Sequence, residues 1–342
     1  MSLPLVILLS LAAVLAAGFF YQSLGARRDR RRFTRAGRWV EIGGGQKLFL
    51  VEKGSGGPAV LFEAGITATN LNWRYIQDKV AAFTATAAYD RSGLGWSSPC
   101  CSRRTPGNIC AELHTMLASA GIEAPYILVG HSFGGLCVRR YAALYPEEVA
   151  GLVLVDPMRC EEWPPLNPGK QSMINRGRKL SAYAIPVARF GFFRLVISLL
   201  MYRSSRLSGR IAKSGGTGGR HVLKRLTEEV GKMPREIWPI IAAHWSRPEY
   251  YVGMQQYVSA VPDTVSEMHD AEPIRNIPIL VLTPGNATPL SEQCLARIGN
   301  NVRQVIAEES AHWIHLDEPD LVIDSIRAMV SDASHSVLSA SA

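Results

Sequence analysis

A serine flanked by glycines is the clearest chemical motif in the chain. The segment Gly130–Gly135 reads Gly-His-Ser-Phe-Gly-Gly and follows the apolar run Tyr126–Val129, with a helical pattern after it. This is G-x-S-x-G in the strand, sharp turn and helix context that the motif requires. Glycines are needed beside the serine because a Cβ atom there would keep the strand and the helix apart. The turn raises the Ser132 hydroxyl at a helix N-terminus, so we expect Ser132 to be a nucleophile.

The base for this serine is sought among the eight histidines, because a serine hydroxyl is a weak nucleophile alone. His312 lies between the last predicted strand and the last predicted helix, and we expect it to be the general base. His315 is the competing candidate, and we expect it to order that loop instead. His131 adjoins Ser132 and cannot easily reach its oxygen. Five others are interpreted as surface or packing residues: His114, His221, His244, His269 and His335.

Short apolar strands alternate with helical patterns over most of the chain, and these elements must position the serine and the histidine. We expect strands over Trp39–Ile42, Lys47–Glu52, Ala59–Phe62, Thr84–Tyr89, Tyr126–Val129, Gly151–Val155, Ile279–Leu282 and Val302–Ile306. We expect helices over Trp73–Phe83, Thr105–Ala120, Phe133–Leu144, Leu290–Ile298 and from Pro319 to about Met329. This alternation predicts an α/β fold class, with a mostly parallel central sheet of about eight strands flanked by helices on both faces.

These motifs resemble those of the α/β-hydrolase fold, and the likeness covers nearly the whole chain after about Trp39. The segment Tyr89–Ser97 is similar to the family's D-x-x-G-x-G-x-S loop after its fourth strand. The serine motif, the segment Leu154–Pro157 and the histidine loop stand in the family's order. An Asp in place of Ser132 would indicate epoxide or haloalkane chemistry. The resemblance is specific for the fold, which hosts esterases, lipases, peptidases, C–C hydrolases and haloperoxidases.

The resemblance also implies an oxyanion hole made of two backbone N–H groups. One group is the amide of Phe133, the residue after the serine. The other comes from the loop after the third strand, where the family often has His-Gly-X. This chain has Ala64-Gly65-Ile66 there, which puts Ile66 in the donor position. Glu63, just before it, is interpreted as a buried structural carboxylate.

The acid of the catalytic triad is where the chain departs from the family's common pattern. The usual segment, Thr283–Pro289 after the seventh predicted strand, contains neither Asp nor Glu. Some members of the family carry the acid at the end of the sixth strand, where this chain has Asp156. We therefore expect Asp156 to orient the His312 ring. The alternatives are Glu292, or Asn286 as the partner with Asp156 only anchoring its loop.

A long stretch over residues 157–276 interrupts the alternation, and we interpret it as an inserted helical lid. Between Met158 and Arg225 it holds 14 Lys/Arg residues against only two glutamates, a local balance of +12. Inside this region the run Phe190–Tyr202 is strongly apolar but short for a bilayer span. Two interpretations remain open. Either the basic and apolar residues of this region contact an anionic membrane, or the apolar run covers the active site while the arginines are solvated.

The N-terminus has the features of a membrane anchor. The segment Leu3–Phe20 carries no charge and is about long enough to cross a bilayer, and the arginine-rich segment Ala26–Arg32 follows it. Because a cleavable signal peptide has its charges before the apolar region, we expect an uncleaved anchor with a cytoplasmic enzyme body. The alternative is an exported protein that is later clipped near Ala16–Gly18. The expected domains are an anchor (1–24), a basic linker (25–38), a core (39–156 and 277–332), the lid (157–276) and a frayed tail (333–342).

Composition excludes several other classes of protein. A hydrophobic fraction of 47% with 19% charged residues is not that of a disordered chain. The six cysteines lack the spacing of a zinc site, so we expect reduced thiols and no metal. No phosphate loop or dinucleotide fingerprint is present, and we expect no cofactor. The net charge of +8 does not indicate nucleic acid, because the basic region is interleaved with apolar residues.

The sequence as a whole predicts a membrane-anchored carboxylic-ester hydrolase that acts through an acyl-enzyme on Ser132. Its expected partner is a small-molecule, hydrophobic ester. One rival hypothesis is the same triad acting on another bond, by C–C cleavage, amide hydrolysis or acyl transfer. Another is a non-catalytic member of the fold that binds a ligand without turnover, but such a protein has no need of both Ser132 and His312.

Overall fold

The computed structural model describes residues 2–159, 166–202 and 229–340. Several residues of the sequence analysis lie outside these ranges, among them Cys160, Glu161, Glu162 and His221. Seven of the 14 basic residues of the lid also lie outside them, in the segment 203–228. The positive balance of the lid is therefore described only in part.

An eight-stranded sheet forms the centre of the molecule, in the order β1-β2-β4-β3-β5-β6-β7-β8. The strands are β1 (Arg38–Glu41), β2 (Lys47–Lys53), β3 (Ala59–Glu63), β4 (Thr86–Asp90), β5 (Tyr126–His131), β6 (Val149–Val155), β7 (Ile279–Pro284) and β8 (Val302–Ala307). The pairs β1–β2 and β2–β4 are antiparallel, and all other neighbours are parallel. Every residue of β3, β4 and β5 is buried, as expected for strands covered on both faces. The predicted fold class is confirmed.

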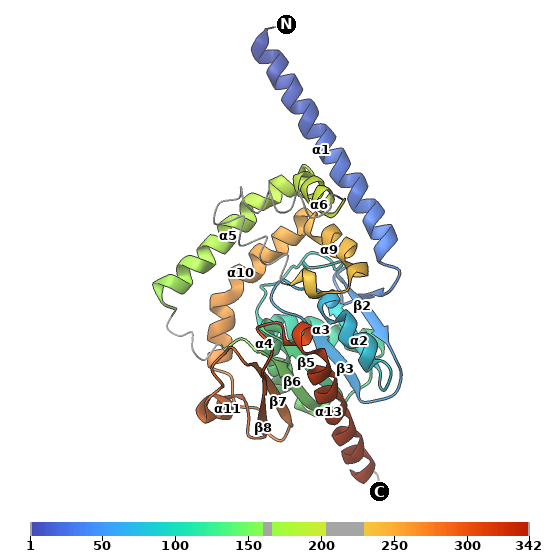
Figure 1. Ribbon diagram of the computed structural model, residues 1–342, viewed down its shortest axis with the longest axis vertical. Coiled ribbons are helices and arrows are strands. Elements are labelled where there is room, and N and C mark those ends of the chain that lie inside the picture. The colour runs from blue at the N-terminus through green and yellow to red at the C-terminus, as the bar shows by residue number, and fades with distance from the viewer. Residues whose placement is uncertain (1, 160–165, 203–228, 341–342) are drawn as a thin grey trace.

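Two helical layers cover the sheet (Figure 1). On one face α3 (Pro106–Ala120), α4 (Phe133–Leu144) and α11 (Glu292–Ile298) share an apolar core with the strands. On the other face the core includes α2 (Arg74–Val80), α12 (Ile314–Asp317) and α13 (Pro319–Ala340). Short 3₁₀ helices cover Asn70–Trp73, Pro146–Glu148, Val230–Lys232 and Arg235–Ile237.

The C-terminal helix α13 is longer than the sequence analysis predicted. It continues to Ala340, through the segment that was expected to be a frayed tail. The apolar spacing that buries Val322 and Ile326 against the sheet extends to Val330 and Ala333, which are also buried. Packing of this stripe accounts for the longer helix, because most helical stability in proteins comes from an amphipathic face.

The expected helical insertion is present and lies over the carboxyl end of the sheet (Figure 1). It contains α5 (Pro168–Arg189), α6 (Phe192–Tyr202), α9 (Trp238–Trp245) and α10 (Pro248–His269). The long helices α5 and α10 pack side by side. Ile174 of α5 and Val261 of α10 form a buried cluster with Leu136 of α4. The lid is therefore seated directly on the helix that follows the serine turn.

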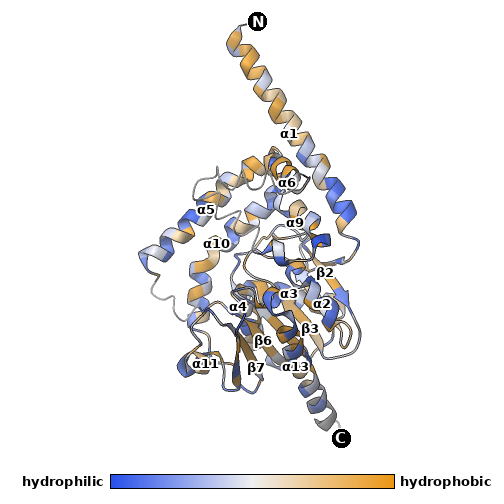
Figure 2. Cartoon of the chain, in the orientation of Figure 1, coloured by the Kyte–Doolittle hydropathy of each residue, from blue (hydrophilic) through white to orange (hydrophobic). Residues whose placement is uncertain are grey.

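The N-terminal helix α1 (Leu3–Phe33) continues past the apolar run and through most of the predicted basic linker. Within the described part of the chain, it is the one unbent helix that is long and apolar enough to span a membrane, and its apolar window is not buried in the protein. Figure 2 shows this apolar half projecting from the body, with the hydrophilic half against it. Arg194 of α6 donates hydrogen bonds to Gln22 (Nε to Oε1, 2.9 Å) and Asp29 (Nη1 to Oδ2, 2.6 Å). These bonds hold the lower half of α1 against the lid.

Candidate active site

The turn at Ser132 has the strained geometry that the sequence motif predicts. Ser132 has φ 53° and ψ −118°, a conformation that costs a residue with a side chain about 1–3 kcal/mol. Two hydrogen bonds hold this residue. The Ser132 N–H donates to the Val155 oxygen (3.1 Å), and the Met158 N–H donates to the Ser132 carbonyl oxygen (3.1 Å). A Cβ atom on Gly130 would lie 2.6 Å from the Gly134 oxygen. Strand β5 and helix α4 therefore approach each other too closely for any side chain there.

His312 and Asp156 form a hydrogen-bonded pair near this turn. The Nδ1 atom of His312, in the loop after β8, lies 2.6 Å from Oδ2 of Asp156 at the end of β6. The Asp156 N–H donates to the Leu282 oxygen of β7 (2.8 Å). This bond fixes Asp156 at the carboxyl end of the sheet. A carboxylate on Nδ1 selects the imidazole tautomer whose Nε2 atom is free to accept a proton.

The alternative partners of His312 are not brought to it. Glu292 begins α11 with an exposed side chain, and no contact joins it to His312 in the described residues. Asn286 likewise has no hydrogen bond to His312 in that part of the chain. Of the three candidates, the structure pairs only Asp156 with the histidine.

His131, which the sequence analysis set aside, supports the histidine loop from below. Its Nε2 atom lies 2.9 Å from the carbonyl oxygen of His312, and the two rings are 4.7 Å apart. Burial lowers the pKa of His131 well below its usual value, so the ring is neutral and donates from Nε2. His131 and His312 are 181 residues apart, and no local pattern indicates this contact.

His315 lies inside the core beneath the same loop. Its ring is 4.7 Å from that of Trp73, and burial lowers its pKa to about 3. Neither ring nitrogen has a hydrogen-bond partner among the described residues. His315 therefore supports the loop by packing as a neutral ring, and it does not compete with His312 for the acid.

The two predicted oxyanion donors lie on adjacent elements. Phe133 is the first residue of α4, and Ile66 lies in the loop after β3. Neither backbone N–H has an acceptor within the part of the chain that the structure describes. A Cβ atom on Gly134 would collide with the Glu63 carbonyl, so this loop passes tightly over the start of α4. Both N–H groups therefore lie near the serine turn with no acceptor among the described residues.

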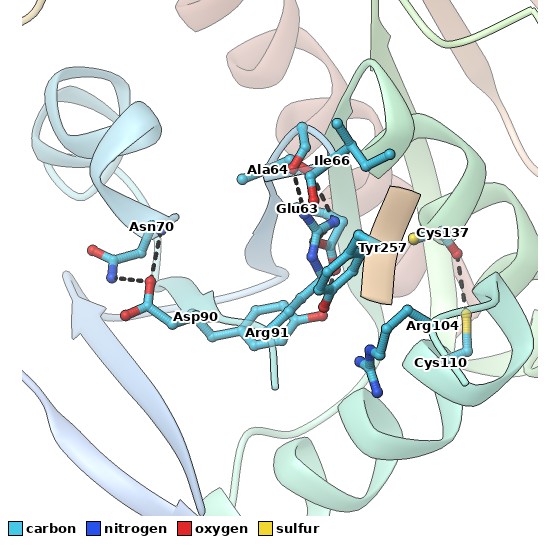
Figure 3. A network of polar contacts seen from close by, with 12 residues as sticks. Glu63, Ala64, Ile66, Asn70, Asp90, Arg91, Arg104, Cys110, Cys137 and Tyr257 are labelled. Carbon is cyan, nitrogen blue, oxygen red and sulfur yellow. Dashed lines mark hydrogen bonds and ion pairs between the residues drawn. The ribbon is translucent and has the colours of Figure 1, made fainter. Parts of the chain in front are cut away.

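A buried arginine holds the Ile66 loop in place (Figure 3). Arg91 donates hydrogen bonds to the carbonyl oxygens of Ala64 (2.9 Å), Gly65 and Ile66 (3.1 Å). With three carbonyls bound to one guanidinium, the peptide groups of the loop are turned so that the N–H groups face away from Arg91. The sequence gives no sign of this role, because arginine is not a residue that the D-x-x-G-x-G-x-S pattern specifies.

Glu63 balances the charge of Arg91, which confirms the expected structural carboxylate. Its Oε1 atom lies 3.0 Å from Arg91 Nη1, with only 1% and 2% of the two side chains exposed. Tyr89 also donates to Glu63. Burial raises the pKa of Glu63, and the Arg91 cation opposes that shift. Removal of one partner from such a pair typically costs about 3–5 kcal/mol, because it leaves a buried charge uncompensated.

Asp90 lies next to this network and holds the loop after β4, which contains Gly93 and Gly95 (Figure 3). Its Oδ1 atom accepts from the backbone (3.0 Å) and side-chain (2.7 Å) nitrogens of Asn70, and its Oδ2 atom accepts from the Trp96 N–H (2.9 Å). Burial raises the pKa of Asp90 to about 6. Among the described residues, no three His, Cys, Asp or Glu side chains are grouped as metal ligands.

Known proteins share this fold and parts of this sequence. Residues 58–241, more than half of the chain, match the family described as the alpha/beta hydrolase fold. The uncharacterised protein YqjL of Bacillus subtilis (strain 168) is 34% identical over 109 residues, which is 31% of this chain and 42% of YqjL. Lipase LipV of Mycobacterium tuberculosis is 36% identical over 111 residues, which is 32% of this chain and 41% of LipV. The chain matches less than half the length of each of these two relatives.

A solved structure gives the same result for the fold. The epoxide hydrolase CorEH superposes with a TM-score of 0.63 and 17% identity, over 86% of this chain and 98% of CorEH. At this identity the likeness shows the fold alone. With the family match over more than half of its length, this chain belongs to the α/β-hydrolase fold family.

Proposed function

We propose that this protein is a serine hydrolase that cleaves a carboxylic ester through an acyl-enzyme on Ser132. The observation that carries the proposal is the Asp156–His312 pair, with 2.6 Å between Oδ2 and Nδ1, beside the strained serine turn. The similarity to a lipase supports ester chemistry. Epoxide opening in this family needs a carboxylate nucleophile at the turn, and this chain has Ser132 there.

The proposed reaction uses these residues in two half-reactions. His312 Nε2 removes the proton from Ser132 while the serine oxygen attacks the ester carbonyl. The oxyanion accepts hydrogen bonds from the N–H groups of Ile66 and Phe133. His312 then protonates the leaving alcohol, and the acyl group stays on Ser132. Water, activated by the same histidine, releases the acid, and Asp156 remains ionised throughout to stabilise the imidazolium.

Arg91 acts in this proposal as a positioning residue. Its bonds to the carbonyls of Ala64, Gly65 and Ile66 determine where the Ile66 N–H points. Its guanidinium also lies 5.2 Å from the Phe133 ring and 5.0 Å from the Tyr257 ring, so it links the loop, α4 and the lid helix α10. A donor that is displaced by a few tenths of an ångström stabilises the oxyanion less.

The proposed substrate is a small hydrophobic ester. Met158 is bonded to the carbonyl of Ser132 and packs, with Ile66, against the apolar clusters between α4 and the lid. Both side chains are half-buried, so an acyl chain beside Ser132 would cover apolar surface. Burial of each methylene group of such a chain contributes about 0.8 kcal/mol.

The membrane contact that we propose is made by α1 together with the joint between α5 and α6. Among the described residues, every exposed large apolar side chain except Tyr75 and Leu144 lies on α1 or on residues 173–199 of these two helices. The two helices are bent by 84° at the joint. Figure 2 shows the apolar surface of α6 close to the point where α1 leaves the body. We call the α5–α6 joint, with its exposed apolar residues, the elbow.

The depth of the elbow follows from its contact with the anchor. A Cβ atom on Gly191 would lie 2.9 Å from the Gly18 oxygen, and a Cβ atom on Gly18 would collide with the Phe190 carbonyl. Gly18 belongs to the apolar run of α1. An α1 that spans the bilayer therefore carries the elbow to the level of the headgroups or below it. With arginines following the apolar run, the proposed orientation places the enzyme body on the cytoplasmic side.

The nucleophile is tested by Ser132→Ala. We expect ester hydrolysis to fall on the order of 10⁴-fold or more, because the acyl-enzyme cannot form. The rate is measured with a short-chain nitrophenyl ester, and circular dichroism confirms the fold. Ser102→Ala, at an exposed serine outside the turn, serves as the control and should keep the full rate. An alanine variant that retains wild-type turnover would exclude Ser132.

The acid is tested by comparing Asp156→Asn with Glu292→Gln. Asparagine at 156 no longer stabilises the imidazolium, so we expect kcat to fall roughly 10²- to 10⁴-fold with little change in KM. The exposed Glu292 should be replaceable with less than about a twofold effect. Small and equal effects at both positions would contradict the assignment of Asp156.

The positioning role of Arg91 is tested by Arg91→Lys, with Arg104→Lys as the matched control. Both arginines are buried and paired with a glutamate, but only Arg91 bonds the Ile66 loop. Lysine keeps the charge and loses the fork of donors, so we expect Arg91→Lys to lower kcat about 10- to 100-fold at nearly constant KM. Arg104→Lys should lower the thermal midpoint while kcat stays within about twofold. Equal losses of kcat in both variants would indicate a merely structural role.

The elbow is tested with a shortened chain that begins near Arg35 and lacks α1. We expect it to co-sediment with anionic vesicles, less with neutral ones, and to be released by salt. The double change Phe192→Ser and Leu195→Ser should weaken binding by about tenfold or more, because two apolar side chains no longer enter the membrane. Leu144→Ser, at an exposed leucine away from the elbow, should have no effect. A chain that remains in the supernatant with both vesicle types at low ionic strength would refute the elbow as a membrane contact.

A further inference from the structure

A cavity of about 400 Å³ lies where the anchor, the lid and the core meet, away from Ser132. Its walls come from the hydrophilic end of α1, the last residue of α5, the end of α9, the first turns of α10, and the glycine-rich loop after β4. Its charged and histidine side chains are those of Arg30, Arg189, His244, Arg247 and Glu249. None of the proposed catalytic residues lines this cavity.

The lining of this cavity carries more positive than negative charge. Three arginines (Arg30, Arg189 and Arg247) line it against the single carboxylate of Glu249, which lies 3.4 Å from the Nε atom of Arg247. Burial lowers the pKa of Arg247, and the neighbouring Arg30 cation lowers it further while Glu249 opposes the shift. Arg30 and Arg247 therefore repel each other at the cavity. An anion placed between them would relieve this repulsion.

Two further groups in the cavity suit an anion. Arg247 is the N-cap of α10, a helix of 22 residues, and its side chain does not cap the helix. The positive end of the α10 dipole therefore faces the cavity. His244 is only 3% exposed, and its Nε2 atom has no hydrogen-bond partner among the described residues. Burial lowers the pKa of His244 to about 3, so the ring is neutral and adds no charge to the lining.

The position of the cavity indicates where such an anion comes from. Arg30 lies six residues beyond Leu24, the last exposed apolar residue of α1, which is about 9 Å along the helix axis. Arg189 directly precedes Phe190, whose carbonyl touches Gly18 in the apolar run. In an anchored protein Arg189 therefore lies level with the end of the apolar run and Arg30 lies about 9 Å beyond that end, so the headgroup layer falls between them.

We propose that this cavity binds a phosphate group, and that its occupant is the phosphate of an anionic lipid headgroup in the leaflet beside α1. Guanidinium groups suit phosphate because they donate two parallel hydrogen bonds. The ligand connects α1, the lid helices and the loop after β4, so it holds the lid to the anchor. The phosphate chemistry is independent of the Ser132 mechanism. Only the lipid origin rests on the proposed membrane anchoring.

The test uses the full chain in a non-ionic detergent, with inorganic phosphate and monomeric dihexanoyl phosphatidic acid as separate probes. Binding is measured by calorimetry at low ionic strength, and dihexanoyl phosphatidylcholine is the zwitterionic comparison. The double change Arg30→Gln and Arg189→Gln removes two ligating charges from exposed side chains, so folding should persist. The matched control, Arg27→Gln with Arg178→Gln, removes one exposed arginine from each of the same two helices outside the cavity. We expect phosphatidic acid affinity to fall at least tenfold in the first variant and less than about twofold in the control.

The probes separate the possible sources of the anion. Phosphatidic acid binding, with or without phosphate binding, that depends on Arg30 and Arg189 supports the headgroup site. Phosphate binding without phosphatidic acid binding would overturn the lipid as the occupant. Equal losses in both variants, equally tight phosphatidylcholine binding, or no saturable binding of either anion would overturn the site. Ester hydrolysis by the same samples reports separately on the proposed function.

Discussion

The close approach of β5 and α4 at Ser132 is the constraint on which the site depends. Because the serine adopts φ 53° and Gly130 and Gly134 have no Cβ, the Ile66 loop can pass directly over the first turn of α4. The hydrogen bonds of Ser132 to Val155 and Met158 place the end of β6, and so Asp156, next to the same turn. One strained residue thus brings the proposed nucleophile, oxyanion loop and acid together at the carboxyl end of the sheet. The strain of about 1–3 kcal/mol is small beside the packing that maintains it.

Buried charge stabilises the geometry around that turn. Arg91 is balanced by Glu63 and bonded to three carbonyls, so its desolvation is offset by contacts that also orient the loop. The Asp156–His312 pair differs, because the histidine side chain is 46% exposed and open to a substrate. At the opposite end of the lid, Arg194 joins α6 to α1 in the same manner. Ion pairs therefore hold the Ile66 loop within the core and join the lid helix α6 to α1.

Features written in local patterns could be predicted from the sequence, and the family resemblance predicted the contact of Asp156 with His312, but other contacts between distant residues could not be predicted. The strands, the serine turn and the helical insertion follow from apolar periodicity, and Glu63 was correctly expected to be structural. The bond from His131 to His312 spans 181 residues and leaves no local signal. The same is true of Arg91 on the Ile66 loop. At the two ends of the chain the predicted helices were too short. Helices α1 and α13 continue through the predicted linker and tail segments, because packing extends helices beyond their apolar runs.

The central claim, a covalent intermediate on Ser132, is tested most directly by locating the bond. The full chain is treated with a fluorophosphonate, digested, and examined by tandem mass spectrometry. We predict one adduct per chain, on the oxygen of Ser132, which forms far more slowly when His312 is replaced by alanine. No adduct, an adduct on a different serine, or labelling that is indifferent to His312 would contradict it.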